Sequence, residues 1–213
     1  MTTKIVFFDC DGTLTRVKSS WQYLHERFDL WNELADEYQR LFRSGLIDYE
    51  EFCRKDATLW KGRKVDEVEA VIQEIEYHDG VRETAHALRE TGITTVILST
   101  GLSILVDRVR RDLGFSAALS NELIARDGVL TGEVKINVGH GRKGQWVRRI
   151  LQDGGFAKDA AAAVGDGEGD KEMFEEVALA IGYNSDARIL PFVDHDLRDG
   201  AFSTIATIIA NSR

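Results

Sequence analysis

Three short apolar stretches of this chain each end in a polar motif that contains glycine. They cover residues 4–9, 94–98 and 161–164, and their length and apolar character are those of buried strands. After residue 78 such stretches alternate with helical patterns, which is typical of a parallel sheet with right-handed crossovers. The carboxyl ends of parallel strands meet at one edge of the sheet, where α/β proteins bind ligands, so the three motifs are expected to converge.

The first motif, Asp9-Cys10-Asp11-Gly12-Thr13, sets two carboxylates directly after an apolar stretch. Side chains alternate along a strand, so Asp9 and Asp11 point to the same side. Two carboxylates held close repel each other, and a cation or a shared proton normally relieves the repulsion. The pair therefore indicates a metal site together with a nucleophile and a partner acid/base. An ordinary turn is the alternative, whereas a calcium loop is excluded because the acidic ligands it needs do not follow.

The second motif, Ser99-Thr100-Gly101, joins a hydroxyl to a glycine-bearing turn before a helical pattern at residues 102–113. Exposed N–H groups and the dipole at a helix start favour an anion, so this motif is a candidate phosphate site. A serine that merely caps the helix is the simpler alternative. Further along, turn signals predict a hairpin over residues 119–138.

The third motif alternates three glycines with three acids directly after a predicted strand, and it reads Gly165-Asp166-Gly167-Glu168-Gly169-Asp170. Carboxylates in a glycine-lined turn suit a hard cation that prefers oxygen ligands. A solvated acidic turn is the alternative. Between the second and third motifs, Arg142-Lys143 precedes a helical pattern and could supply the positive charge that a bound phosphate needs, unless both side chains are simply solvated.

The segment between the first motif and the second strand shows a helical pattern throughout, with apolar residues at spacings of three and four. Within it, Asp48 followed three residues later by Glu51 is a capping-box-like helix start. We therefore predict a Rossmann-like α/β core, a parallel sheet with helices on both faces, formed by residues 1–15 and 79–213. Residues 16–78 are predicted to be a small helical-bundle cap inserted after the first strand.

Composition limits the kind of partner. A chain of 213 residues with 43% hydrophobic residues can bury a substantial core. Its net charge of −9 disfavours nucleic acid and anionic membranes as partners, and no apolar run approaches the roughly 18 residues of a membrane span. The N-terminus lacks the pattern of a signal peptide, and Cys10 and Cys53 form neither a zinc nor a disulfide pattern. We expect a cytoplasmic protein, either a monomer or a homodimer.

Taken together, the motifs resemble those of the haloacid dehalogenase (HAD) superfamily, and in particular its phosphoserine phosphatase-like branch. The resemblance covers essentially the whole chain, because the helical insertion after the first motif matches the cap of that branch. Any one motif is moderately specific, but all of them in family order are strongly so. The motifs are Asp9-Cys10-Asp11-Gly12-Thr13, Ser99-Thr100-Gly101, Lys143-Gly144 and Gly165-Asp166-Gly167-Glu168-Gly169-Asp170.

The resemblance implies a Mg2+-dependent phosphomonoester hydrolase that acts on a small phosphorylated metabolite. Asp9 would attack phosphorus and form an aspartyl-phosphate, while Asp11 would protonate the leaving alcohol and later activate water. The Mg2+ ligands would be the Asp9 carboxylate, the Asp11 backbone carbonyl and Asp166. Asp170 would support them. An anionic nucleophile can approach an anionic phosphate only if positive charge offsets their repulsion.

On the same resemblance, Ser99 and the backbone around Thr100 and Gly101 would bind the phosphoryl oxygens, and Lys143 would neutralise them. Two positions depart from the branch. It prefers Gly directly after the Ser, where Thr100 stands, and it often has Asn before the final Asp, where Gly169 stands. These departures concern the substrate and metal surroundings rather than the two reactive carboxylates.

The residues that hold phosphoserine in this branch are not matched. Counting from the motifs, the acid that binds the substrate ammonium falls at Lys18, and the arginine that binds its carboxylate falls near Asp56. Both charges are therefore reversed. Arg43 and Arg54 lie nearby in the cap and are candidates to replace the lost cation, unless all four are plain surface charges. Phosphoserine is the leading single candidate, and another small phosphorylated acid or sugar is the alternative.

Three other functions are alternatives to a phosphomonoester hydrolase. A phosphotransferase would pass the same aspartyl-phosphate to an acceptor alcohol. A catalytically silent phosphate- or metal-binding module is expected to lack Asp9 or Asp11, and both are present. A phosphoryl-accepting regulatory domain also carries an aspartate on a parallel sheet, but the helical insertion and the spacing of Asp9 and Asp11 disfavour it.

Overall fold

The centre of the protein is a sheet whose strands are β1 (Ile5–Phe8), β2 (Thr94–Leu102), β3 (Ala117–Arg126), β4 (Val129–Lys135), β5 (Ala161–Gly165), β6 (Leu179–Tyr183) and β7 (His195–Leu197). The computed structural model describes residues 2–31 and 33–212. The strands lie in the order β4-β3-β2-β1-β5-β6-β7. All neighbours are parallel except β3 and β4, which form an antiparallel hairpin.

Strand β1 lies in the middle of this sheet, between β2 and β5. The chain builds one half of the sheet with β2, β3 and β4, and then crosses back to build the other half with β5, β6 and β7. Where the strand order reverses in this way, the carboxyl ends of the strands open a crevice in which α/β proteins bind their ligands. The predicted α/β fold is confirmed, and its reversal point lies beside the first motif.

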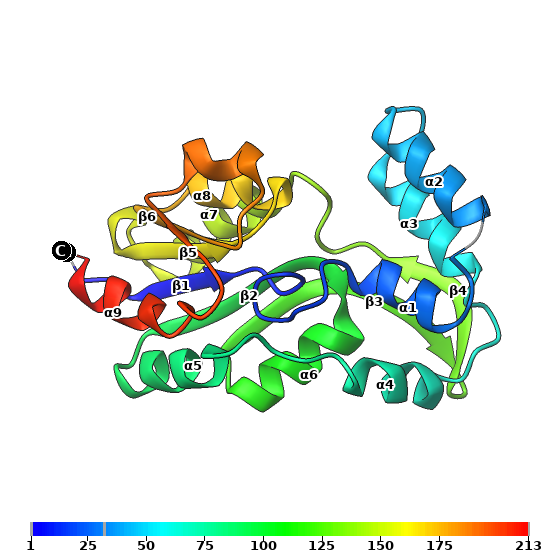
Figure 1. Ribbon diagram of the computed structural model, residues 1–213, viewed down its shortest axis with the longest axis horizontal. Helices are drawn as coiled ribbons and strands as arrows, with labels where there is room; N and C mark the ends of the chain where they lie inside the picture. The colour runs from blue at the N-terminus through cyan, green and yellow to red at the C-terminus, as the bar shows by residue number, and fades with distance from the viewer. Residues whose placement is uncertain (1, 32, 213) are drawn as a thin grey trace.

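Helices cover both faces of the sheet (Figure 1). On one face lie α5 (Val81–Glu90), α6 (Ser103–Leu113) and α9 (Thr204–Asn211), and on the other lie α7 (Lys143–Gly154) and α8 (Lys171–Glu175). Among the helices that the structure describes, none combines the length and the apolar character needed to cross a membrane.

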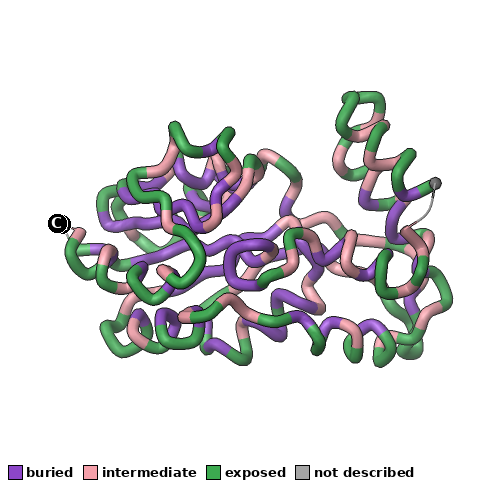
Figure 2. The backbone as a smooth tube through the Cα atoms, viewed as in Figure 1, coloured by how far each residue is buried: buried purple, intermediate pink, exposed green. Residues whose placement is uncertain are grey.

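Each face of the sheet has its own hydrophobic core. Along β1, Val6 and Phe8 belong to one core and Ile5 and Phe7 to the other, because successive side chains of a strand point to opposite faces. Figure 2 shows the resulting buried centre. A strand covered on both faces is apolar throughout rather than alternating. Packing on both sides fixes β1, and so fixes where Asp9 emerges at the sheet edge.

Residues 16–78 are helical, with no strand among those that the structure describes. Their helices are α1 (Ser20–Arg27), α2 (Glu33–Arg43), α3 (Tyr49–Thr58) and α4 (Val65–Gln73). The predicted helix start at Asp48 is confirmed, since its side chain accepts a hydrogen bond from the N–H of Glu51 at 2.7 Å. The pair α2 and α3 projects away from the sheet (Figure 1).

The hairpin of β3 and β4 fulfils the prediction for residues 119–138 and also supports the helical segment. The N–H of Gly62 donates to the carbonyl of Leu130, and the N–H of Val65 donates to that of Gly128, both at 2.9 Å. The hairpin therefore extends the sheet beneath the helices and fixes one end of the segment relative to the core.

Two elements differ from the sequence-based expectation. The second strand continues to Leu102 instead of ending at residue 98, and α6 begins only at Ser103. The reason is that β2 pairs with β3 on both sides of the second motif, Leu98 with Leu119 and Leu102 with Asn121, and the motif lies in the shift in register between these two pairs. The short edge strand β7 was not predicted, because three mostly exposed residues carry no recognisable hydrophobic pattern.

Candidate active site

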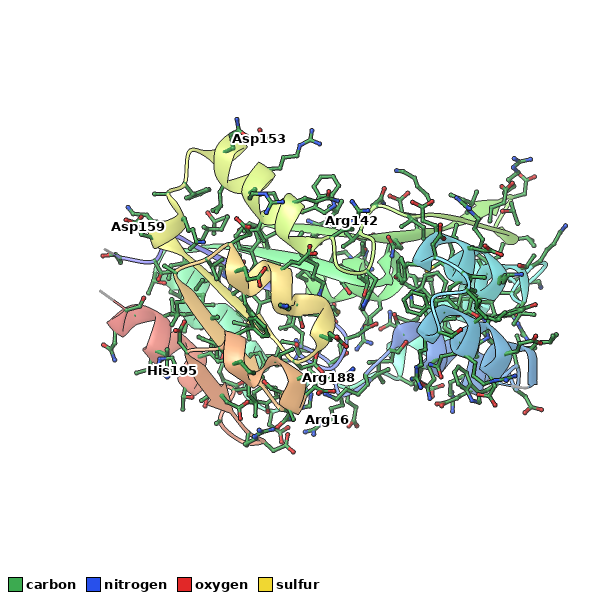
Figure 3. The ribbon with its side chains drawn as sticks, turned by 90° about the horizontal axis from the view of Figure 1, so that it is seen from above. Arg16, Arg142, Asp153, Asp159, Arg188 and His195 are labelled. Atoms are coloured by element: carbon green, nitrogen blue, oxygen red, sulfur yellow. The ribbon has the colours of Figure 1, made fainter. Side chains whose placement is uncertain are left out.

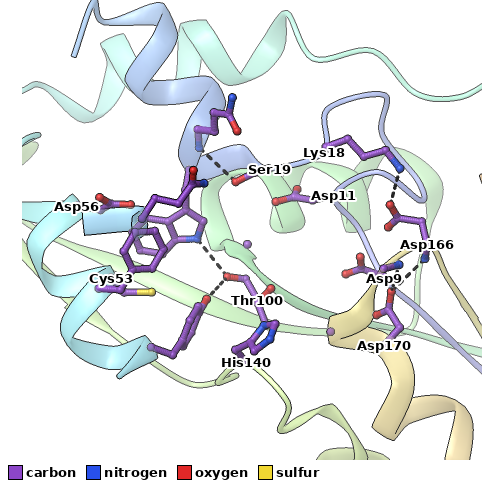
Figure 4. Close-up of a pocket in the computed structure, with 18 of the residues that line it drawn as sticks. Asp9, Asp11, Lys18, Ser19, Cys53, Asp56, Thr100, His140, Asp166 and Asp170 are labelled. Carbon is purple, nitrogen blue, oxygen red and sulfur yellow. Dashed lines mark hydrogen bonds and ion pairs between the residues drawn. The ribbon is translucent and has the colours of Figure 1, made fainter. Parts of the chain in front are cut away.

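A cavity of about 270 Å³ lies at the carboxyl end of β1. Its walls come from both parts of the chain, the helices of residues 16–78 on one side and the sheet edge on the other (Figure 4). The three motifs converge here, as predicted. Their contribution to the lining includes Asp9, Asp11, Thr100, Gly101, Asp166 and Asp170, together with Lys143.

The ammonium group of Lys143 joins the first and third motifs. Its Nζ donates to Asp9 Oδ1 and to Asp170 Oδ1, both at 2.6 Å, and the residue is only 2% exposed. Burial lowers the pKa of Lys143, but the charges of Asp170 and Asp9 more than offset this and raise it above its usual value. Lys143 is therefore a permanently charged cation beside Asp9. Arg142, labelled in Figure 3, is exposed and does not line the cavity.

Negative charge is concentrated around Asp9. Burial and the nearby Asp170 raise the pKa of Asp9, and Lys143 opposes the shift. Burial and Asp170 also raise the pKa of Asp166 to about 6, although Thr13 and Lys18 donate hydrogen bonds to its carboxylate at 3.1 and 2.5 Å. Three buried carboxylates, Asp9, Asp166 and Asp170, face two lysines, Lys18 and Lys143, so the fully ionised cluster has an excess of negative charge.

A divalent metal ion would balance this excess of negative charge. Oxygen atoms of Asp9, Asp166 and Asp170 all lie within 4.8 Å of one another, and the three residues are buried. Three carboxylates without sulfur or imidazole are the donor set of a hard cation such as Mg2+. Asp170 has the least capacity left to bind a metal ion, because its Oδ2 already accepts hydrogen bonds from the N–H groups of Asp166 and Gly167.

The carboxylate of Asp11 is held by the start of α1. Its Oδ2 accepts hydrogen bonds from the N–H and the hydroxyl of Ser20 at 2.8 and 2.7 Å, while its Oδ1 is buried and has no hydrogen-bond partner. Burial raises the pKa of Asp11, which the two bonds from Ser20 partly oppose. One oxygen is thus fixed and the other is free to carry a proton. The side chain of Asp11 is not part of the acidic metal group.

Two glycines of the motifs allow this close packing of carboxylates. Gly12 has a φ of +81°, and a Cβ there would lie 2.6 Å from Asp166 Oδ2. A Cβ on Gly165 would lie 2.5 Å from the carboxyl carbon of Asp170. A larger residue at Gly12 would push the first and third motifs apart, and one at Gly165 would displace Asp170 within the third motif. Both glycines are therefore required by the close approach of a carboxylate.

The second motif contributes backbone more than side chains. Ser99 is buried, does not line the cavity, and uses its hydroxyl to accept the N–H of Gly101 at 2.9 Å. The carbonyl of Thr100 accepts hydrogen bonds from Trp21 Nε1 at 3.1 Å and from the Tyr49 hydroxyl at 2.9 Å. The helix-start cradle expected at this motif is not formed, because the motif is part of β2. Thr100 and Gly101 lie on the cavity wall.

The charged residues of the segment 16–78 that were candidates for substrate binding, and the two at the reversed positions, differ in where they lie. Arg43 and Arg54 are exposed and do not line the cavity, and Arg54 instead pairs with Glu50 at 2.9 Å. Lys18 lines the cavity and binds Asp166. Asp56 also lines the cavity and is buried, so the alternative that it is a surface charge is excluded.

Sequence reasoning missed three residues that shape the site, Ser20, Trp21 and Tyr49. Ser20 follows the helix-capping Ser19, so nothing in the sequence marked it as the partner of Asp11. Trp21 fitted the apolar spacing of a helix, and its indole N–H carried no separate signal. A buried Trp or Tyr usually finds a partner for its polar atom, which is the one general rule that pointed to these contacts.

Comparison with known proteins gives consistent results. The family of haloacid dehalogenase-like hydrolases matches residues 6–175. A phosphoserine phosphatase of Halobacterium salinarum is 30% identical over 193 residues, which is 90% of both chains. One of Archaeoglobus fulgidus is 29% identical over 201 residues, or 94% of this chain, and this chain spans only 56% of its length.

A solved structure of a substrate-bound phosphoserine phosphatase complex has a TM-score of 0.80 and 26% sequence identity, and covers 92% of this chain and 93% of its own. The match in family, sequence and fold extends over the elements that carry all the motifs. The chain therefore belongs to the haloacid dehalogenase-like hydrolases, and within them to the phosphoserine phosphatase-like phosphatases.

Proposed function

We propose that this protein hydrolyses the phosphate monoester of a small metabolite with the help of Mg2+, through an aspartyl-phosphate formed on Asp9. The observation that carries the proposal is the position of Asp9. It is 8% exposed, lines a cavity at the reversal point of the sheet, and is bound by the buried cation of Lys143. A carboxylate in this position can act as a nucleophile toward an electrophile in the cavity.

Positive charge is what allows Asp9 to attack an anionic ester. Lys143 holds one oxygen of Asp9 at 2.6 Å, so the side chain is oriented and its other oxygen is available. Mg2+, held by Asp9 and Asp166 with Asp170 in support, would offset the charge that the phosphoryl oxygens bring into the site. Lys143 is fixed before the substrate arrives, and such preorganised charge stabilises a phosphoryl-transfer transition state.

Asp11 is the proton donor and acceptor in this proposal. Its Oδ1 has no partner and its pKa is raised by burial, so it can hold a proton for the leaving alcohol. After the alcohol departs, the same oxygen can take a proton from the water that attacks the phosphorus of the aspartyl-phosphate. The hydrogen bonds from Ser20 keep the carboxylate in one orientation for both steps.

We predict burst kinetics for Asp11→Asn. With nitrophenyl phosphate, whose leaving group needs no proton, formation of the aspartyl-phosphate should continue while its hydrolysis slows by about 100-fold or more. Stopped-flow absorbance should then show one equivalent of nitrophenolate per enzyme, followed by slow turnover. A linear time course at the wild-type rate would show that Asp11 does not act in the second step.

A second prediction concerns Mg2+ binding itself. At about 100 times its dissociation constant, Mg2+ should stabilise the folded protein by about 2.7 kcal/mol. Thermal unfolding with EDTA or with Mg2+ measures this gain without reference to activity. In Asp166→Asn the gain should largely disappear, whereas Asp159→Asn, an exposed acid remote from the cavity, should keep it. An equal gain in all three proteins would place the metal elsewhere.

Phosphoserine is the first single compound to test, because relatives of this chain are named phosphoserine phosphatase. Residues 16–78, which we propose act as the cap, form the wall of the cavity that would contact the alcohol part of the ester. Phosphate release from a panel of phosphorylated acids, sugars and amino alcohols tests the function directly. Adding acceptor alcohols to the same assay distinguishes a phosphotransferase, because new phosphate esters would then replace inorganic phosphate.

A further inference from the structure

The wall that the helices of residues 16–78 give to the cavity has an unusual composition. Its aromatic residues are Trp21, Trp31, Tyr49 and Phe52. The other polar groups there are the uncharged side chains of glutamine, serine and cysteine, together with two charged residues, Lys18, which precedes α1, and Asp56. None of the described residues that line the cavity is an arginine.

Asp56 is a buried carboxylate without adequate partners. It is 2% exposed, its Oδ1 has no hydrogen bond of good geometry, and the one ion-pair partner that the described residues offer it is the ring of His25, with Nε2 at 3.5 Å. Both ring nitrogens of His25 also lack hydrogen bonds. Buried polar groups are normally satisfied. A ligand group that donates hydrogen bonds and carries positive charge would supply what Asp56 lacks.

The aromatic side chains around Asp56 favour the same kind of group. Trp21 and Tyr49 both donate to the carbonyl of Thr100, at 3.1 and 2.9 Å, so their rings are fixed relative to the end of β2. The faces of aromatic rings carry partial negative charge, which attracts cations and repels anions. A carboxylate placed on this wall would lie near Asp56, and the one cation of residues 16–78 that lines the cavity, Lys18, is already paired with Asp166.

The two lysines of the cavity do not change this conclusion. Lys143 is engaged by Asp9 and Asp170, and Lys18 by Asp166. Figure 4 shows Lys18 beside Asp166 on the core side of the cavity, with Asp56 on the opposite side. Both lysines are therefore committed to the acids on the side where the phosphoryl group would bind, and neither is left to pair with Asp56 on the side where the alcohol part would bind.

We propose that the substrate is the phosphate monoester of a small amino alcohol, which carries an ammonium group and no carboxylate. The ammonium would donate to Asp56 and lie among the rings of Trp21, Trp31, Tyr49 and Phe52, while the phosphoryl group faces Asp9. This inference rests on the proposed function and names its substrate class. It also explains the charge at Asp56, which a substrate bearing a carboxylate at this wall would oppose.

Four esters that differ by one group at a time test the proposal on the wild-type protein. They are the phosphates of serine, ethanolamine, hydroxypropionate and ethanol, which carry both charged groups, the amine alone, the carboxylate alone, and neither. We expect kcat/KM for phosphoethanolamine to exceed that for phosphoserine by about tenfold or more, and that for ethyl phosphate by about 100-fold. Equal or better turnover of either ester that carries a carboxylate would overturn the inference and leave the proposed function intact.

Failure of the proposed function looks different. It would appear as no phosphate release from any of the four esters or from nitrophenyl phosphate, and the inference would fall with it.

The variant Asp56→Asn tests whether Asp56 causes the preference for an ester that carries an amine. It should lower the ratio of kcat/KM for phosphoethanolamine to that for ethyl phosphate by about tenfold, mainly through KM. Glu51→Gln, an exposed acid on the same helix, should leave that ratio unchanged. A ratio that Asp56→Asn does not alter would also overturn the inference.

Discussion

Replacing Asp9 by asparagine should reduce phosphate release by about four orders of magnitude or more, because the amide cannot form the aspartyl-phosphate. The substitution keeps the shape of the side chain, and Lys143 keeps its second partner, Asp170 Oδ1 at 2.6 Å. This is checked by measuring phosphate release with Mg2+ for the wild type and for Asp9→Asn, on a substrate that the wild type turns over.

The folded state of Asp9→Asn should survive the change. Asp9 is one of three neighbouring buried acids whose mutual repulsion opposes folding, so removing one negative charge should not lower the melting temperature. Circular dichroism and thermal unfolding provide the control. A well-folded Asp9→Asn protein that retains more than about a tenth of the activity would remove Asp9 from the role of nucleophile.

Lys143→Met should lose both activity and stability. Removing this cation leaves Asp9 and Asp170 buried without their shared partner, and breaking a buried ion pair from one side costs about 3–5 kcal/mol. For a protein of this size we expect the melting temperature to fall by about 10 °C. Thermal unfolding in EDTA measures this effect, because bound metal would otherwise offset part of the missing charge.

The adjacent Arg142 offers a matched control. It is exposed and outside the cavity, so Arg142→Met should change the free energy of unfolding by about 0.5 kcal/mol or less. Activity of Lys143→Met should fall by about 1,000-fold, since the charge that stabilises the transferred phosphoryl group is lost. Equal melting temperatures for the two variants would show that Lys143 is not the cation that balances the buried acids.

The parallel sheet and the convergence of the motifs at one of its edges were predictable from the sequence. Buried parallel strands have a simple apolar pattern, and polar residues after them must lie at one sheet edge. Asp9, Asp11, Asp166 and Asp170 line the cavity for this reason, and Lys143 lines it from the start of α7. Their spacing along the chain, rather than any long-range contact, carried the information.

The surroundings of the substrate were less predictable. Arg43 and Arg54 were candidates because they lie close to the cavity residues in sequence, but the helix turns them to the surface. Asp56, on the same helix as Arg54, is turned inward instead. Which face of a short helix meets a cavity depends on how the helices pack together, and a single charged residue has no pattern that reveals it. The place of Ser99 inside β2 likewise depends on a long-range contact, because β2 pairs with β3 on both sides of the motif, at Leu98 and Leu102.

The most direct test of the account is to identify the phosphorylated residue. Protein quenched with acid during turnover would be digested and its peptides analysed by mass spectrometry, with Asp11→Asn used to let the intermediate accumulate. The proposed mechanism predicts one additional phosphoryl group on the peptide that contains Asp9, and hydroxylamine should remove it because it is an acyl phosphate. The same peptide of Asp9→Asn should carry no phosphoryl group. Turnover with an unmodified Asp9 peptide, or phosphate on another residue, would contradict it.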